Sequence, residues 1–273
     1  MTFAEQLQSA SRQNSSLLCV GLDPDPQRLP AAVNSDHDSV YAFCAALIEA
    51  TTDLVCAYKP NSAFFEALGP HGYETLRRVI AAVPSHIPVI LDAKRGDIGS
   101  TAEAYARAVF DVLDADAVTL SPYLGGDALA PFLRYHDRGC IVLCKTSNAG
   151  SADLQNVPLA DDRPLYVHVA ERARDEWNTH GNVGLVVGAT HPSVLREVRV
   201  LCPTMPLLVP GVGAQGGDVI EAVQAAVDAA GENVIINASR SIMYASSGSD
   251  FAEAARTEAL RLCDLINRGR DAA

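Results

Sequence analysis

The sequence predicts an α/β protein built as a single (β/α)8 barrel, the TIM-barrel fold. Eight short apolar runs alternate with longer helical patterns along the 273 residues, and this alternation is typical of parallel strands joined by helical crossovers. The hydrophobic content is 48%, with few aromatic residues, which suits strands that are buried on both faces. Polar residues follow most of these runs, at the strand ends where barrel enzymes build their active sites.

Each predicted strand is an apolar run that ends in polar or glycine-rich residues. The strands are expected at Ser16–Leu22, Leu54–Lys59, Val89–Lys94, Ala117–Ser121, Cys140–Lys145, Val183–Val187, Leu207–Val209 and Val234–Asn237. The helices are expected at about 38–52, 70–82, 100–113, 125–135, 164–179, 192–201, 216–230 and 250–267. No linker or change of composition divides the chain, so residues 1–273 are predicted to form one domain, with a short polar N-terminal segment at 1–15.

An open, doubly wound sheet is the alternative fold. That fold favours a glycine-rich, phosphate-binding turn after the first strand, whereas this chain continues there as Gly21-Leu-Asp-Pro-Asp-Pro26. A closed barrel therefore fits better. Its two longer connections, Asp23–Asp38 and Ser147–Arg163, are expected on the face formed by the carboxyl ends of the strands.

Composition excludes several classes of protein. The net charge of -12 argues against a general affinity for nucleic acid or an anionic membrane. Residues 1–16 lack the apolar core of a signal peptide, and no apolar run approaches the roughly 20 residues of a membrane helix. The seven cysteines contain no CxxC pair, so we expect buried thiols in a reducing compartment rather than disulfides or a zinc site. The chain is predicted to be cytoplasmic.

The end of the third predicted strand and the loop after it carry three charges. Apolar residues 88–91 lead into Asp92, Lys94 and Asp97. On a strand, Asp92 and Lys94 point to the same side, and buried opposite charges are costly unless they are paired. An isolated Asp–Lys pair at a strand end is usually a surface salt bridge. Here Asp23 and Lys59 follow the first two strands, and the four groups together predict a charge network in one cleft.

Two further segments predict a phosphate site. The glycine-rich turn 210–217 leaves backbone N–H groups free to bind an anion, and it contains Gln215. Arg240 follows the eighth strand and offers a forked, charge-assisted contact. In barrels, the loops after strands 7 and 8 often bind phosphate. The histidines are scattered, with no pair at metal-ligand spacing, so no metal site is expected.

These residues resemble the orotidine 5'-phosphate decarboxylase family. Its signature is an apolar strand followed by D-x-K-x-x-D, then Ile or Val, a small residue, any residue and Thr, which matches Asp92–Thr101. Lys59, the glycine-rich turn and Ser239–Ile242 follow the family's order, although many members have glycine in place of Ser239. The resemblance covers residues from about 16 to 245. Within the family, the chain is similar to the longer-chain bacterial branch, type 2.

The resemblance implies a cofactor-free decarboxylation of orotidine 5'-phosphate to UMP and CO2, the last step of de novo pyrimidine nucleotide synthesis. It assigns Lys94 as the proton donor to C6 of the pyrimidine. It places Asp92 near the departing carboxylate, with Lys59 and Asp97 completing the network. No cofactor and no metal are implied.

The resemblance also implies how the pyrimidine nucleotide binds. Asp23 and Lys59 would bind ribose hydroxyls, and Ser147 would bind the base. The phosphate contacts fall to Gln215 and Arg240. Asp97 and Thr101 would reach the ribose bound by a neighbouring subunit, which implies a homodimer with shared active sites.

The residues themselves agree with this chemistry. Loss of CO2 from an sp2 carbon leaves a carbanion without an electron sink, so the enzyme must supply a fixed cation and a proton. A lysine kept ionised by aspartates does both. Asp92 either holds Lys94 in place or also stresses the substrate carboxylate, and the sequence leaves both roles open.

Two other functions are compatible with the residues. A metal-dependent sugar-phosphate aldolase or decarboxylase with a related motif would need Mg²⁺ and an additional carboxylate near the second strand, for which Glu66 is a candidate. A non-catalytic barrel that binds a phosphate ligand is the third interpretation, and the complete set of charges argues against it.

Overall fold

Eight parallel strands form a nearly closed barrel in the computed structural model, which describes residues 1–33, 38–212 and 218–273. The strands are β1 (Leu18–Leu22), β2 (Ala57–Pro60), β3 (Ile90–Arg95), β4 (Ala117–Leu120), β5 (Gly139–Lys145), β6 (Val183–Val187), β7 (Leu207–Pro210) and β8 (Val234–Ala238). Their order in the sheet is β2-β1-β8-β7-β6-β5-β4-β3. Single parallel bridges from Tyr58 to Val89 and from Asn61 to Asp92 join the two edge strands. The predicted (β/α)8 barrel is confirmed.

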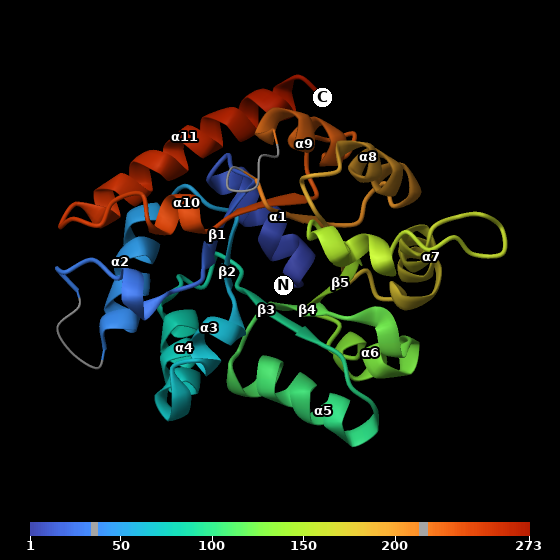
Figure 1. Ribbon diagram of the computed structural model, residues 1–273, viewed down its shortest axis with the longest axis horizontal. Coiled ribbons are helices and arrows are strands. Elements are labelled where there is room, and N and C mark those ends of the chain that lie inside the picture. Colours follow the sequence, from blue (N-terminus) through green and yellow to red (C-terminus); the bar gives the residue numbers. More distant parts are fainter. Residues whose placement is uncertain (34–37, 213–217) are drawn as a thin grey trace.

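Helices surround this barrel (Figure 1). They are α2 (Ser39–Thr51), α4 (Gly72–Ala82), α5 (Gly99–Arg107), α6 (Gly126–Leu133), α7 (Leu165–Arg172), α8 (Pro192–Leu201), α9 (Val219–Ala226) and α11 (Phe251–Asp271). These correspond to the eight predicted helices. The π-helical turns η3 (Ala108–Val112) and η6 (Ala173–Trp177) extend α5 and α7. None of the helices described is both long and apolar enough to cross a membrane.

The shorter helices lie in the connections. Those with α-helical geometry are α3 (Ser62–Glu66) and α10 (Arg240–Met243). The 3-10 turns are η1 (Pro26–Arg28), η2 (Gly69–His71), η4 (Pro122–Leu124) and η5 (Ala149–Asp153). The sequence patterns did not predict these short elements. All but η2 lie in the first part of a connection that follows a strand, so they shape the mouth at the carboxyl ends of the strands.

The N-terminal segment forms a helix that was not predicted. This helix, α1 (Phe3–Gln13), begins with a capping box. The Thr2 N–H donates to Glu5 Oε2 at 2.8 Å, and the Glu5 N–H donates to Thr2 Oγ1 at 3.3 Å, which satisfies two backbone donors of the first turn. Phe3 and Leu7 lie four residues apart and are both buried. The segment is polar in composition, yet it presents one apolar face.

That apolar face closes the amino-terminal end of the barrel. Phe3 and Leu7 pack in one cluster with inward-facing residues from every strand, and Figure 1 shows α1 across the centre of the ring. Gly139 leaves room for this contact, because a Cβ atom there would lie 2.4 Å from Phe3 Cδ1. Water is therefore kept from this end of the barrel, and the opposite end is left for polar groups.

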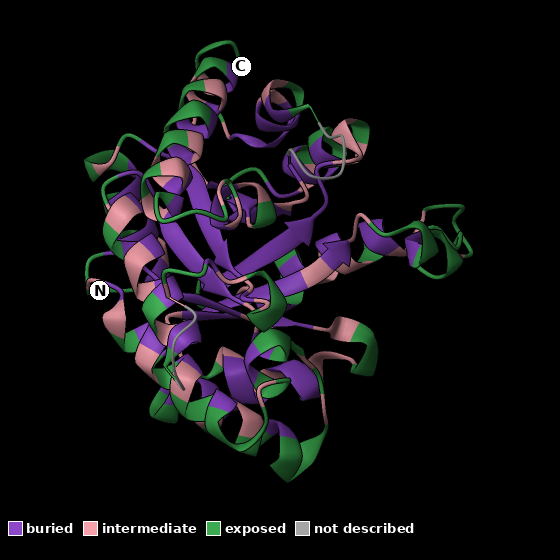
Figure 2. Cartoon of the chain, turned by 60° about the vertical axis from the view of Figure 1, so that its left-hand side comes forward, coloured by how far each residue is buried: buried purple, intermediate pink, exposed green. Residues whose placement is uncertain are grey.

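The inward-facing residues change from apolar to polar along the strands. Side chains alternate on a strand, so residues two apart face the same side. Beyond Ala57, Ile90 and Ala117 in the apolar cluster, the next inward-facing residues on three strands are Lys59, Asp92 and Thr119. Figure 2 shows the strands as a buried centre, with exposed residues on the outer helix faces and loops. The fold thus places three polar side chains in one layer at the mouth of the barrel.

All seven cysteines are free and buried, as predicted for small apolar residues. Burial raises the pKa of Cys19 to about 12 and the pKa of Cys202 to about 11. Both thiols therefore stay protonated and unreactive at neutral pH.

We predict that replacing Phe3 by Ala lowers the free energy of unfolding by about 3 kcal/mol, because it removes the aromatic ring that fills the end of the barrel. Urea denaturation measures the change. Ser9→Ala on the exposed face of α1 is the control, with an expected change within about 0.5 kcal/mol. Equal stability of the two variants would show that α1 does not seal the barrel.

Candidate active site

Three charged side chains meet at the mouth of the barrel. Lys59 Nζ lies 2.8 Å from Asp92 Oδ2, and Lys94 Nζ lies 2.6 Å from Asp92 Oδ1. The side chain of Lys59 is 4% exposed and that of Asp92 is 12% exposed, whereas that of Lys94 is 50% exposed. One carboxylate therefore joins a buried ammonium to an ammonium that solvent and ligands can reach.

A break in strand β3 produces this arrangement. The register with β4 pairs Leu91 with Val118 and then Arg95 with Leu120, so the residues between them bulge from the ladder. Within the bulge, Lys94 has a φ of +46°, a left-handed conformation that is uncommon for a residue with a side chain. Such strain persists only where the surrounding structure enforces it, and it is frequent at functional sites.

The two lysines keep Asp92 ionised. Burial alone would raise the pKa of Asp92, but the charges and hydrogen bonds of Lys59 and Lys94 outweigh burial and hold this pKa well below its usual value. Burial alone would likewise lower the pKa of Lys59, and the negative charges of Asp92 and Asp23 instead raise it. At neutral pH the site therefore contains a fixed carboxylate and a fixed buried ammonium.

A cavity of about 250 Å³ opens beside this cluster. Its walls, as far as the described residues show, combine charged, polar and apolar side chains from β2 to β7. The lining residues are Lys59, Asp92, Lys94, Thr119, Leu143, Thr146, Ser147, Asn148, Val186, Leu208 and Pro210. The predicted base-binding residue Ser147 is among them, so it faces the same space as Lys94.

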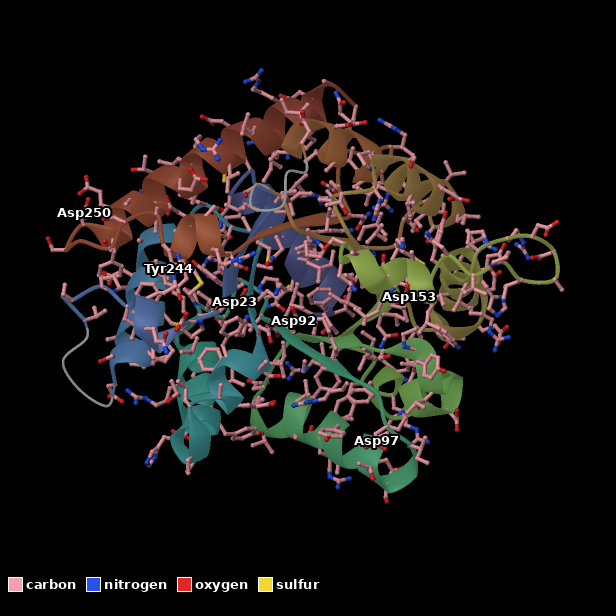
Figure 3. The ribbon with its side chains drawn as sticks, viewed as in Figure 1. Asp23, Asp92, Asp97, Asp153, Tyr244 and Asp250 are labelled. Atoms are coloured by element: carbon pink, nitrogen blue, oxygen red, sulfur yellow. The ribbon has the colours of Figure 1, made fainter. Side chains whose placement is uncertain are left out.

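Asp23 also lies near the charge cluster. It follows β1, and Figure 3 shows Asp23 and Asp92 near the centre of the barrel. One of its carboxylate oxygens, Oδ1, is buried and makes no hydrogen bond within the described part of the chain. A buried acceptor without a donor is unfavourable, and a ligand hydroxyl would satisfy it.

Asp97 and Thr101 lie away from the cluster. Figure 3 shows Asp97 at the rim, close to α5, where its Oδ1 accepts a hydrogen bond from the backbone N–H of Ile98 at 2.8 Å. Thr101 is exposed on α5. Within one chain, Lys94 is thus held by Asp92 and not by two aspartates.

Arg240 is exposed at the start of α10, and α10 is fastened to the loop after β1. The backbone N–H of Asp23 lies 3.1 Å from Met243 Sδ, and that of Asp25 donates to Tyr244 Oη at 2.7 Å. The Arg28 guanidinium covers the Tyr244 ring at 3.8 Å, a cation–π contact. The segments that carry Asp23 and Arg240 are therefore joined. Gln215 lies outside the described residues.

The third lysine, Lys145, does not enter the cavity. It is 3% exposed, and its Nζ donates to Ser151 Oγ at 2.7 Å. This bond attaches η5 to the end of β5 and so supports the loop that contains Ser147. Lys59, Lys94 and Lys145 are the only lysines in the sequence, and all three lie at the carboxyl ends of strands.

Comparison with known proteins identifies the family. Residues 16–256 match the model of the family described as orotidine 5'-phosphate decarboxylase / HUMPS. The chain belongs to this family.

Curated relatives and solved structures are similar to almost the whole of this chain. The orotidine 5'-phosphate decarboxylase of Roseiflexus sp. (strain RS-1) is 62% identical over 267 residues, which cover 98% of each chain. The structure of Leishmania donovani OMP decarboxylase is 47% identical, with a TM-score of 0.87 and complete coverage of both chains. Leishmania donovani UMP synthase is 48% identical, with a TM-score of 0.89, and the chain spans 57% of its length.

Glu66, the candidate for an additional metal ligand, has another partner. It is on α3 and pairs with Arg95, with 3.0 Å between Oε1 and Nη2. No group of three His, Cys, Asp or Glu side chains within residues 1–33, 38–212 and 218–273 is placed to hold a metal ion. The metal-dependent alternative thus loses the ligand that the sequence suggested for it.

Sequence reasoning missed two residues of the site. Thr119 contacts the Asp92 carboxylate, with 2.9 Å between Oγ1 and Oδ1, and its inward position, two residues beyond Ala117, could have indicated this. Tyr244 supports the loop after β1. No sequence signal indicates that role, because it depends on how α10 packs.

We predict that Asp92→Asn lowers the free energy of unfolding by about 3–5 kcal/mol at pH 7, since it leaves the buried Lys59 ammonium without its charged partner. The pKa of Asp92 is lower in the folded chain than in the unfolded chain. The ionised carboxylate therefore stabilises the fold above the unfolded value of about 3.9 and ceases to do so as the pH falls below it.

The difference in stability between wild type and Asp92→Asn should then be constant from about pH 7 to 5 and shrink below about pH 4. Urea denaturation at several pH values measures it, with Asp264→Asn on the exposed side of α11 as the control. A difference that grew in acid would contradict the assigned direction of the Asp92 pKa.

Proposed function

We propose that the chain is a cytoplasmic, cofactor-free enzyme that decarboxylates orotidine 5'-phosphate to UMP and CO2, the last step of de novo UMP synthesis. The observation that carries the proposal is the Asp92 carboxylate held between Lys59 and Lys94 beside a cavity. The 62% identity to the Roseiflexus orotidine 5'-phosphate decarboxylase supports this activity within a family whose description also includes HUMPS. Seven free thiols suit a reducing compartment.

Lys94 is the proton donor in this mechanism. The bond between C6 of the pyrimidine and its carboxylate breaks, CO2 leaves, and the electron pair stays on C6. The Lys94 ammonium stabilises this charge as it forms and then transfers a proton to C6. Because its side chain is half exposed, the resulting amine regains its proton from water.

Asp92 prepares the lysine for this step. Contacts from Lys59, Lys94 and Thr119 fix its carboxylate before any substrate arrives. This preorganisation supports a positioning role. A substrate carboxylate placed beside Asp92 also experiences repulsion that the loss of CO2 relieves, so the two roles coexist.

The remaining site residues bind the nucleotide around this centre. Ser147, in the wall of the cavity, contacts the base. Asp23 and Lys59 bind ribose hydroxyls, which gives the unsatisfied Asp23 oxygen a donor. Arg240 and Gln215 bind the phosphate, whose distance from C6 lets binding energy organise the site.

The active enzyme is a homodimer in which Asp97 and Thr101 complete the partner's site. Both residues lie outside the cluster of their own chain. The neighbouring loops expose large apolar side chains, with Ile98 60%, Tyr123 77% and Leu124 46% exposed. Apolar side chains gathered at such a face are typical of a protein–protein interface.

We predict that the purified chain converts orotidine 5'-phosphate to UMP, followed by the change from orotate to uracil absorbance, and that the rate is the same in EDTA. Lys94→Ala should lower kcat by at least about 1,000-fold, because it removes both the proton donor and the fixed charge. Arg196→Ala, an exposed change on α8, is the control. A folded wild-type chain without turnover would rule out the function, and loss of activity in EDTA would favour the metal-dependent alternative.

We predict that mixing two inactive variants restores activity. A hybrid of Lys94→Ala and Asp97→Asn subunits has one site with an intact Lys94 and the partner's intact Asp97. Random exchange makes about half of the dimers hybrids, so the mixture should reach about one quarter of the wild-type rate. If Asp97 served its own subunit's site, the mixture would stay as inactive as its components.

A further inference from the structure

The hydroxyl of Thr119 is at the centre of the strained segment of β3. Thr119 belongs to β4 and is 1% exposed. Its Oγ1 lies 2.9 Å from Asp92 Oδ1, 3.1 Å from the Ala93 backbone nitrogen and 2.9 Å from the Lys94 backbone nitrogen. One side chain thus contacts three consecutive residues of the neighbouring strand.

These contacts use the whole hydrogen-bonding capacity of a hydroxyl, which has one proton to donate and two lone pairs. Thr119 donates to the Asp92 carboxylate, which has no proton at neutral pH, and it accepts from the N–H groups of Ala93 and Lys94. Valine has the same shape and can make none of these bonds. Serine keeps the hydroxyl and can make all three.

The bulge in β3 explains why the hydroxyl is needed. The regular β3–β4 pairs stop at Leu91 with Val118 and resume at Arg95 with Leu120. Residues 92–94 therefore face Thr119 alone across the ladder. The N–H groups of Ala93 and Lys94 find their acceptor in the Thr119 side chain instead of a backbone carbonyl. This replacement holds Lys94 in its left-handed conformation.

The same hydroxyl orients the Asp92 carboxylate. Asp92 Oδ1 accepts from both Thr119 and Lys94 Nζ, and Oδ2 accepts from Lys59 Nζ. With Oδ1 fixed by Thr119, the carboxylate presents one oxygen to each lysine. The Thr119 hydroxyl thus holds both the backbone at Lys94 and the side chain of Asp92.

We propose that Thr119 is a positioning residue that sets the geometry of the Asp92–Lys94 pair for proton transfer. This inference rests on the proposed decarboxylase function. Thr119 acts through Asp92 and Lys94 and is not the proton donor. A displacement of about 1 Å in a reacting group lowers a rate by roughly 100-fold, so loss of the hydroxyl should lower kcat far more than it affects nucleotide binding.

The test compares Thr119→Val and Thr119→Ser with wild type, after wild-type turnover of orotidine 5'-phosphate has been established. Thr119→Val should lower kcat by about 100-fold, with KM and the affinity for UMP within about threefold. Thr119→Ser should keep kcat within about threefold of wild type. The matched control is Thr51→Val, which removes another buried hydroxyl that bonds Leu47 and Tyr58 and should leave kcat unchanged.

Three outcomes would overturn the proposal. These are a Thr119→Val enzyme with kcat within threefold of wild type, an equal fall of kcat in Thr51→Val, and a rise in KM at constant kcat, which would mean that Thr119 contacts the substrate. If Thr119→Val does not fold, Thr119→Ala replaces it with the same expected kinetics.

A crystal structure of the Thr119→Val variant tests the geometry and needs no enzymatic activity. The positioning role of Thr119 can therefore be decided even if the proposed function fails. In the valine variant we expect Lys94 to leave the left-handed region, or its Nζ to move beyond 3.5 Å from Asp92 Oδ1. An unchanged Asp92–Lys94 pair would refute the positioning role even if wild type has no activity towards orotidine 5'-phosphate.

Discussion

The mouth of this barrel depends on one carboxylate buried between two ammonium groups. Moving a charge out of water costs several kcal/mol unless partners compensate for the lost hydration. Asp92 compensates Lys59, which is almost completely buried, and at the same time fixes Lys94, which is half exposed. The three groups together carry one net positive charge, and Lys94 places an ammonium in the wall of the cavity. The same imbalance suits a reaction in which negative charge develops on a substrate carbon.

The part of the barrel interior below this cluster is apolar. Phe3 and Leu7 of α1 fill the amino-terminal end, and the inward-facing layer above them contains only apolar side chains. Asp92 therefore lies on a dry, close-packed layer of low compressibility. The charge cluster lies at the opposite end, where the bulge in β3 interrupts the regular pairing with β4.

Strand and helix positions could be predicted because an apolar run ending in polar residues is a local signal, and the signature around Asp92 and Lys94 is local too. Other features depend on contacts that no local pattern encodes. The left-handed backbone of Lys94 and the three bonds of Thr119 follow from the register of β3 against β4. Residues 1–15 were predicted only as a polar segment, because just one face of α1, the face with Phe3, is apolar. The role proposed for Asp97 involves a second chain, which no local pattern in one chain encodes.

The restriction of lysine to the barrel mouth has a consequence for proton chemistry. The sequence contains 21 lysine and arginine residues, of which only Lys59, Lys94 and Lys145 are lysines. A guanidinium does not release its proton in a protein, whereas an ammonium does. The exposed arginines elsewhere thus carry positive charge but do not act as proton donors. Among the three lysine amines, Lys94 alone is substantially exposed, so an amine-selective reagent would distinguish it from every other side chain.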